Sequence, residues 1–212
     1  MKDFPVFTTE NGVASLILRE IPYSQTAYIK LLDSQDPEAL LNECRQFCTV
    51  VGAERIYATG DPCLQKFSLC ARICEMEQIW TEVPHTKAKT TSVSAENLSL
   101  WKDIYNNKMR NVPNAAYMDE AEAKRMLSDG SGYFVELNGK VVGIGKGADD
   151  TIEVIASTVP GAGEDVVLAL CKQLGGTHFR LQVADTNARA MALYDRLGFS
   201  IIKEISCWYQ IL

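Results

Sequence analysis

The chain has 212 residues, of which 47% are hydrophobic and 23% are charged. This length suits one large domain or two small ones, and the apolar content is sufficient for a globular core. The net charge of -6 is spread along the chain without a basic stripe, which argues against nucleic acid or an anionic membrane surface as a partner. The sequence shows neither a long apolar span nor a secretory signal at its start, so we expect a soluble, cytoplasmic protein.

The seven cysteines are an odd number in a chain without a secretory signal, which indicates reduced thiols rather than a disulfide framework. Cys44 with Cys48, and Cys70 with Cys74, have the spacing of residues on one helix face, which is compatible with metal ligands. Both pairs also fall among apolar residues, where free cysteine behaves as a small hydrophobe. We favour this second interpretation and expect no metal site.

Residues 1–85 are predicted to form a small α/β region with the element order ββαβα. Both helix starts carry an aspartate followed by a proline, which favours a capped helix with proline in its first turn. The first helix would begin at Asp36 and end at Gly52, and the second would begin at Asp61. The expected strands are Ala14–Ile21, Thr26–Leu32 and Arg55–Gly60, and the second helix is expected to cover Cys63–Glu77.

Residues 86–93 are polar and lack a hydrophobic period, so they are predicted to be a linker before a second domain, residues 94–212. Two helices are expected first, followed by a hairpin with Asn138 and Gly139 in its turn. A strand, a helix, a strand, a helix and a closing pair of strands complete the domain. The order strand, helix, strand, helix occurs on both sides of the linker, as a distant internal duplication would produce.

The segment Val183–Ile202 predicts the last helix and leaves one residue unexplained. Asn187 or Thr186 can cap its start, and Gly198 is placed to end it in a left-handed conformation. Tyr194 belongs to neither signal. The helix alone allows either a core aromatic whose hydroxyl finds a partner or a phenol with a chemical role.

The string N-A-R-A-M-A-L-Y-D-R-L-G-F in this segment resembles the N-x-x-A-x-x-L-Y-x-x-x-G-F signature of the GNAT superfamily of acyl-CoA-dependent N-acetyltransferases. The matched positions are Asn187, Ala190, Leu193, Tyr194, Gly198 and Phe199. The resemblance covers about residues 94–212, including the order of helices and strands. It implies a mixed α/β, GNAT-like fold in which two strands of the central sheet splay apart to admit the cofactor.

The resemblance also implies a chemistry. The acyl donor would be acetyl-CoA, and the acceptor would be a primary amine of a small molecule or a peptide. Tyr194 would act as the general acid that protonates the departing sulfur, while a base or a water chain takes the proton of the amine. Asn187 would hydrogen-bond the cofactor arm or orient the backbone there.

The second signature of that family, [RQ]-x-x-G-x-[GA], is a loop whose N–H groups cradle the diphosphate of CoA at a helix start. The resemblance assigns cofactor binding to Ser157, Gly161, Ala162, Gly163, Asp165 and Val166. The first position of the signature is lost, because Ala162 or Pro160 stands there, depending on the register. Asp165 is a second departure, since a carboxylate about 4 Å from one phosphate charge costs about 4 kcal/mol at an effective dielectric of about 20. The cradle therefore requires that the Asp165 side chain turn away from the diphosphate. Alternatively, Glu164 and Asp165 only stabilise the start of the helix through its dipole.

The base, the acceptor pocket and the role of the N-terminal region stay open. The resemblance implies a carboxylate base on the strand that enters the loop, and Glu153 stands there, with Ile155 on the same face by strand alternation; a solvated edge charge is the alternative. Trp101 and Tyr105 either line the acceptor pocket or pack on the sheet. The N-terminal region would close that pocket, complete the sheet or form the interface of a homodimer. The alternative to an enzyme is a catalytically inactive GNAT-like binding module that has lost CoA.

Overall fold

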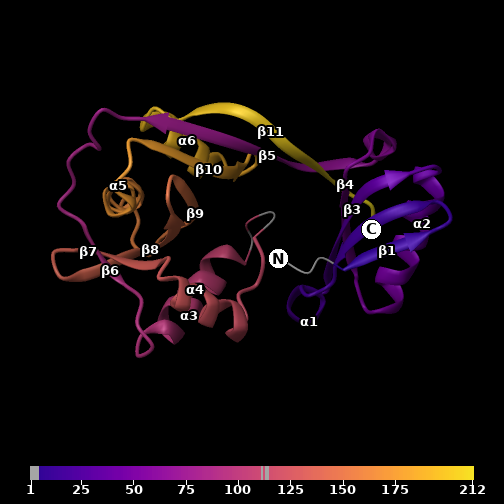
Figure 1. The fold of residues 1–212 in the computed structure, drawn as a ribbon, viewed down its shortest axis with the longest axis horizontal. Coiled ribbons are helices and arrows are strands. Elements are labelled where there is room, and N and C mark those ends of the chain that lie inside the picture. Colours follow the sequence, from indigo (N-terminus) through magenta and orange to yellow (C-terminus); the bar gives the residue numbers. More distant parts are fainter. Residues whose placement is uncertain (1–4, 111, 113–114) are drawn as a thin grey trace. The chain divides into compact units, whose positions relative to one another are not determined.

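The computed structural model describes residues 5–110, 112 and 115–212. The chain divides into two compact units (Figure 1): unit 1 comprises Met1–Ile73 with Glu204–Leu212, and unit 2 comprises Cys74–Lys203. The predicted boundary lay at residue 85, so unit 1 ends earlier than predicted and regains residues from the far end of the chain. In the part of the chain that the structure describes, no helix is both long enough and apolar enough to cross a membrane.

Unit 1 contains strands in the order β1-β2-β3-β4-β11, with the long helix α2 on one face. Strand β3 pairs parallel to β4 over five consecutive positions. Helix α2 begins as predicted, because the Asp36 side chain accepts a hydrogen bond from the Ala39 N–H at 3.0 Å. Its buried side is Leu40, Leu41, Cys44 and Cys48. The elements are β1 (Val6–Thr9), β2 (Gly12–Ile17), α1 (Ile21–Ser24), β3 (Thr26–Ser34), α2 (Pro37–Val50), β4 (Arg55–Thr59) and the end of β11 (Ser200–Gln210).

The second predicted helix of the N-terminal region, Cys63–Glu77, is wrong. Its place is taken by the short 3-10 helix η1 (Pro62–Lys66) and the strand β5 (Ser68–Ile79). Asp61 does cap η1, but the helix ends after that single short turn. Buried Ala71 and Ile73 then flank the exposed Arg72, which is the period of a strand. Pairing within the sheet thus overrides the helix-start signal.

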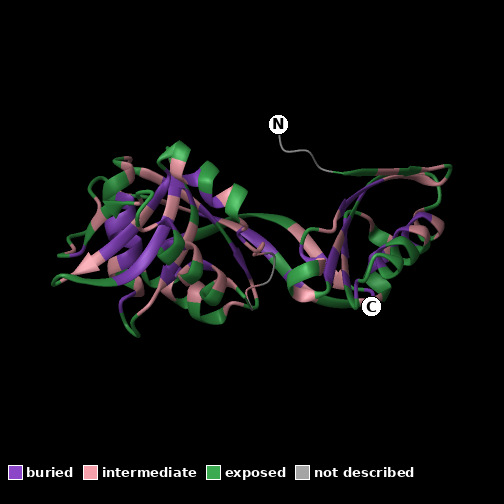
Figure 2. Ribbon diagram, turned by 90° about the horizontal axis from the view of Figure 1, so that it is seen from below, coloured by how far each residue is buried: buried purple, intermediate pink, exposed green. Residues whose placement is uncertain are grey.

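Unit 2 contains strands in the order β5-β10-β9-β8-β7-β6, with helices on both faces (Figure 1). Helix α5 packs on the face of Val135, whereas α3 and α4 pack on the face of the neighbouring Phe134. Helix α5 lies close to the sheet, because a Cβ built on Gly143 would be 2.4 Å from Val166 Cγ2. Buried residues are concentrated along these strands (Figure 2). The elements are β6 (Lys89–Ser92), α3 (Leu98–Met109), α4 (Glu120–Asp129), β7 (Gly132–Leu137), β8 (Lys140–Ala148), β9 (Thr151–Ser157), α5 (Gly163–Leu174), β10 (His178–Ala184) and α6 (Ala188–Arg196).

The predicted linker, residues 86–93, contains strand β6. This strand pairs antiparallel with β7, from Lys89 opposite Glu136 to Ser92 opposite Tyr133. It stands last in the strand order of the sheet. An edge strand tolerates polar residues on both faces, and this explains why the segment carries no hydrophobic period in the sequence.

The two long strands β5 and β11 are exchanged between the units. The predicted closing pair of strands is the single strand β11, and its end pairs with β4 in unit 1, where Tyr209 lies opposite Ala58. The end of β5 lies beside β10 in unit 2, and just past it the Trp80 N–H donates to the Thr177 carbonyl at 2.8 Å. Each half of the chain therefore supplies a strand to the sheet of the other unit.

Candidate active site

The strands β9 and β10 of unit 2 are parallel but pair at only two positions. Arg180 lies opposite Thr151 and Leu181 lies opposite Ile152. Past these positions the two strands, all of whose residues are described, form no further pairs, although β9 continues to Ser157 and β10 to Ala184. Main-chain N–H and C=O groups on the facing edges are thus left for another partner. This splayed pair of strands is the central feature of the candidate site.

The loop that follows β9 leads directly into the first turn of α5. Gly161 has φ +87°, a conformation that favours glycine. Ala162 is the N-cap residue and makes no side-chain hydrogen bond to the helix, so the first N–H groups of α5 lack a side-chain acceptor there. A Cβ built on Gly163 would be 3.0 Å from Leu193 Cδ2 of α6, so this turn has little room for a side chain. Exposed N–H groups at a helix start form an anion site.

Two of the other predicted cofactor residues do not face this loop. Val166 is completely buried and packs in the core under α5. Asp165 points away, because its Oδ1 accepts a hydrogen bond from Thr86 Oγ1 at 2.6 Å. The Thr86 oxygen in turn accepts from the Ala88 N–H at 3.0 Å. The carboxylate that opposed a diphosphate site in the sequence is thus engaged elsewhere.

Tyr194 lies on α6 in the core of unit 2 and is 8% exposed. Burial, with a smaller contribution from Cys171, raises the pKa of its phenol to about 12. The hydroxyl has no hydrogen-bond partner among the described residues. Its oxygen nevertheless keeps some exposed surface, because it is absent from the set of completely buried polar atoms without a partner, which consists of Ser15 Oγ, Glu43 Oε2 and Trp208 Nε1 in the described part of the chain. The phenol is therefore protonated at neutral pH and keeps an accessible oxygen.

The helix that carries Tyr194 is fixed at both ends. At its start the Asn187 side chain accepts a hydrogen bond from the Ala190 N–H at 3.2 Å, so Asn187 acts as the cap. At its end the Gln78 amide donates to the Gly198 carbonyl at 2.6 Å and accepts from Trp80 Nε1 at 2.7 Å. Sequence analysis missed Gln78 and Trp80, because the preceding segment carried helix signals. The signal available in the sequence was the alternation of apolar and polar residues along β5, which matches its alternating burial.

Glu153 occupies a β-bulge at the point where β9 leaves β10. Lys146 of β8 lies opposite Val154, and Gly147 lies opposite Ile152, so Glu153 is the extra residue. Its carboxylate forms an ion pair with the Lys146 ammonium. The bulge therefore turns Glu153 to the face of Val154, and the predicted alternation with Ile155 is wrong.

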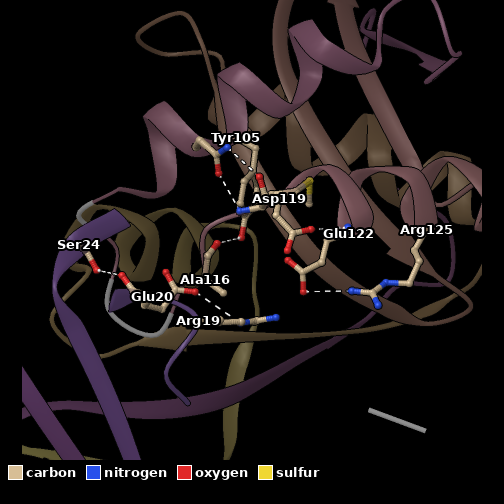
Figure 3. Close-up of polar contacts among 10 residues, drawn as sticks. Arg19, Glu20, Ser24, Tyr105, Ala116, Asp119, Glu122 and Arg125 are labelled. Atoms are coloured by element: carbon tan, nitrogen blue, oxygen red, sulfur yellow. Dashed lines mark hydrogen bonds and ion pairs between the residues drawn. The ribbon is translucent and has the colours of Figure 1, made fainter. Parts of the chain in front are cut away.

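Trp101 and Tyr105 stack on each other with ring centroids 5.6 Å apart. Trp101 is completely buried, and its indole N–H donates to the Tyr133 carbonyl at 3.0 Å. The Tyr105 hydroxyl donates to the Ala116 carbonyl at 2.8 Å, just before α4 (Figure 3). The packing alternative is therefore the right one for Trp101, and Tyr105 holds the segment that precedes α4.

No family model matches the sequence, and no curated protein matches it. Solved structures are similar in fold. A GCN5-related N-acetyltransferase from Sphaerobacter thermophilus has a TM-score of 0.61 at 11% identity, over 93% of this chain and 75% of that one. One from Kribbella flavida has a TM-score of 0.58 at 15% identity, over 98% and 88%. A tandem GNAT protein from the clavulanic acid biosynthesis pathway has a TM-score of 0.55 at 13% identity, over 94% and 78%. The predicted GNAT-like fold is thus confirmed, over most of the chain.

Proposed function

We propose that the chain is an acetyl-CoA-dependent N-acetyltransferase that acts on a primary amine of a small molecule or a peptide, with its site in unit 2. The observation that carries this proposal is the separation of β9 from β10 beside the uncapped start of α5. An open strand edge next to a helix N-terminus combines acceptors and donors for an amide-containing arm with an anion site.

The residues of the site fit CoA. The turn Gly161–Gly163 is poor in side chains and would accept the diphosphate through main-chain N–H groups. The β9 edge from Glu153 to Ser157 would bind the amide-bearing arm. Asp165 does not oppose this arrangement, because Thr86 holds its carboxylate.

When bound, acetyl-CoA supplies an acetyl group activated as a thioester, with a thiolate as the leaving group. An amine that attacked its carbonyl carbon would form the amide bond as the carbon–sulfur bond breaks, and Tyr194 would donate its proton to the departing sulfur. Burial raises the pKa of the nearby Cys171 thiol to about 12 as well. The Tyr194 phenol therefore lies in a buried part of the core and keeps a proton to donate at neutral pH.

The attacking amine must lose a proton, and Glu153 is the proposed acceptor, directly or through water. Its carboxylate forms an ion pair with Lys146, and its side chain is 48% exposed, so an acceptor can reach it. The amine would compete with the Lys146 ammonium for this carboxylate. Glu153 would then hold the nitrogen near the carbon that it attacks.

A titration with acetyl-CoA followed by calorimetry tests the proposal. We expect saturable binding, and we expect a panel of primary amines to include one that releases free thiol in a protein-dependent manner. An absence of binding at millimolar acetyl-CoA would contradict the enzyme and support the inactive module. Binding without thiol release from any amine class would leave CoA recognition but not catalysis.

A further inference from the structure

The short segment Pro84–Ala88, here called the strap, leads into β6 at the end of the sheet where β9 finishes. The strand registers show this directly. Thr90 of β6 lies opposite Val135, Val135 lies opposite Gly143, and Gly143 lies opposite Ser157. Ser157 is the last residue of β9, so the strap and the loop into α5 lie at the same end of the strands.

The strap is fastened to α5. Its Thr86 hydroxyl donates to Asp165 in the first turn of the helix at 2.6 Å. Ala88 is 7% exposed and packs in one cluster with Ala162, the N-cap residue. Farther along, Thr90 Oγ1 lies 2.7 Å from Gln173 Oε1 in the last turn of α5. The chain from the strap into β6 therefore follows the helix along its length.

The loop into α5 itself lacks a positive charge. Where the related signature has arginine or glutamine, this chain has Ala162 or Pro160. The first turn of α5 carries two acidic residues, Glu164 and Asp165. A cation from another segment would therefore strengthen the binding of a diphosphate by the main-chain N–H groups of this turn.

Lys87 can supply that cation. It follows Thr86, whose hydroxyl touches the first turn of α5, and its side chain is exposed. Among the described residues it has neither an ion-pair nor a hydrogen-bond partner. A lysine on a flexible stem is a point charge suited to phosphate.

We propose that the strap brings Lys87 to the phosphates of the cofactor and that Asp165 is the anchor of the strap. This inference rests on the proposed function. It assigns a role to Asp165, the residue that departs most from the family signature. The Asp165 carboxylate would hold the strap, which carries the positive charge of Lys87 that the loop lacks. The ligand chemistry is that of a phosphorylated acyl carrier such as CoA.

Calorimetry with acetyl-CoA on the full chain tests the role of Lys87. We expect Lys87→Met to weaken binding about five- to tenfold at low ionic strength, and the difference from the wild type to vanish at high salt. Lys89→Met is the matched control, because Lys89 is two positions farther along and lies opposite Glu136; its affinity should equal that of the wild type.

Equal affinity of Lys87→Met and wild type at low salt would overturn the inference and leave the proposed function standing. Equal losses in Lys87→Met and Lys89→Met would also overturn it, because they would indicate only a general effect of net charge. If the wild type binds no acetyl-CoA, the proposed function fails first.

The anchor is tested by Thr86→Val and Asp165→Asn, with thermal unfolding as a check on the fold. Asp165→Asn retains an acceptor for the Thr86 hydroxyl and removes the negative charge, so binding should stay equal or tighten. Thr86→Val frees the strap, and it should weaken binding and make a further Lys87→Met change nearly silent. Thr86→Ser should restore the affinity. Wild-type affinity in Thr86→Val, or full additivity in the double variant, would contradict the anchoring role.

Discussion

Both units contain the same run of elements, a hairpin and a third antiparallel strand followed by a helix and a parallel strand. In unit 1 this run is β1-β2-β3-α2-β4, with the short helix α1 inserted between β2 and β3, and in unit 2 it is β7-β8-β9-α5-β10. The parallel strands β3 and β4 pair at five positions, from Thr26 opposite Arg55 to Lys30 opposite Thr59. The strands β9 and β10 pair at two. The comparison teaches that a candidate site arises where the sheet leaves its own hydrogen bonds unmade.

The starts of helices α2 and α5 show the same contrast between the units. Asp36 caps α2 by accepting from the Ala39 N–H, whereas Ala162 offers no cap to α5. At this helix start unit 1 supplies its own side-chain acceptor, whereas unit 2 leaves the corresponding N–H groups of α5 without one. The internal duplication suggested by the sequence stays a prediction, and the shared run of elements supports it.

The largest expected effect separates the phenols of Tyr28 and Tyr194. Tyr28 of unit 1 and Tyr194 of unit 2 both have a pKa raised to about 12, chiefly by burial. Tyr194→Phe should lower kcat about a thousandfold, or by about 4 kcal/mol, because the proton donor is lost. Tyr28→Phe should leave kcat unchanged, and acetyl-CoA affinity should survive in both variants. Steady-state kinetics and calorimetry check this, and equal kcat in the Tyr194→Phe variant would remove the phenol from the mechanism.

The second effect is a loss of stability at alkaline pH. Burial raises the pKa of Cys44 and Cys171 from 9.0 to about 12, and that of Cys48 to about 11. The unfolded chain therefore loses these protons first as pH rises, so the free energy of unfolding is constant below about pH 8 and falls above pH 9. At pH 10 each thiol should cost about 1.4 kcal/mol.

Urea unfolding across this pH range measures the loss. Two of the three thiols lie on α2 of unit 1 and one on α5 of unit 2. The double variant Cys44→Ala/Cys48→Ala should therefore lose the contribution of two of these thiols, about 2.8 kcal/mol at pH 10, and keep that of Cys171 and of Cys63, whose pKa is also raised to about 11. A decline of undiminished size in that variant would assign the effect to other groups.

The third effect concerns how closely each helix approaches its sheet. Beneath α2 the strand β2 carries Ala14, whereas beneath α5 the strand β8 carries Gly143. Gly143→Ala would place a methyl group 2.4 Å from Val166 Cγ2 and 2.8 Å from the Ala156 carbonyl. We expect this overpacking to cost about 2 kcal/mol in urea unfolding.

Gly176→Ala is the control for that change. Its new methyl group would meet nothing closer than 3.6 Å, so its stability should stay within about 0.5 kcal/mol of the wild type. An equal loss in the two variants would show that the conformational freedom of glycine, rather than its packing under α5, determines the cost.

Short-range signals determined how much of the fold was predictable. The hairpin turn at Asn138 and Gly139 has positive φ at both residues, and Gly198 ends α6 at φ +84°, as predicted. The Asp61 signal failed, because a cap nucleates one turn but does not decide whether the next residues pair in a sheet. The strand exchange was not predictable, since no local pattern states which sheet a strand joins.

The site was predictable only where the residues are local. The loop Gly161–Gly163 and its neighbouring helix follow from one string. The partner of Asp165 is Thr86, which is separated from it by 79 residues. The bulge at Glu153 also depends on register with β8, which alternation along β9 alone does not contain. Tertiary contacts therefore decide whether the residues of the signature segments can form a binding site in this chain.

The smallest effect tests whether an uncapped helix is enough to make a site. Asp36→Ala removes the cap of α2 and should cost about 1 kcal/mol in urea unfolding. Asp119→Ala is the matched control, because Asp119 caps α4 by accepting from the Glu122 N–H at 2.8 Å. Both variants should still bind one acetyl-CoA per chain in calorimetry, because β3 and β4 remain paired whether or not α2 is capped. A second binding event in Asp36→Ala would mean that the helix start alone recruits the cofactor, and the splayed strands would lose their place in the argument.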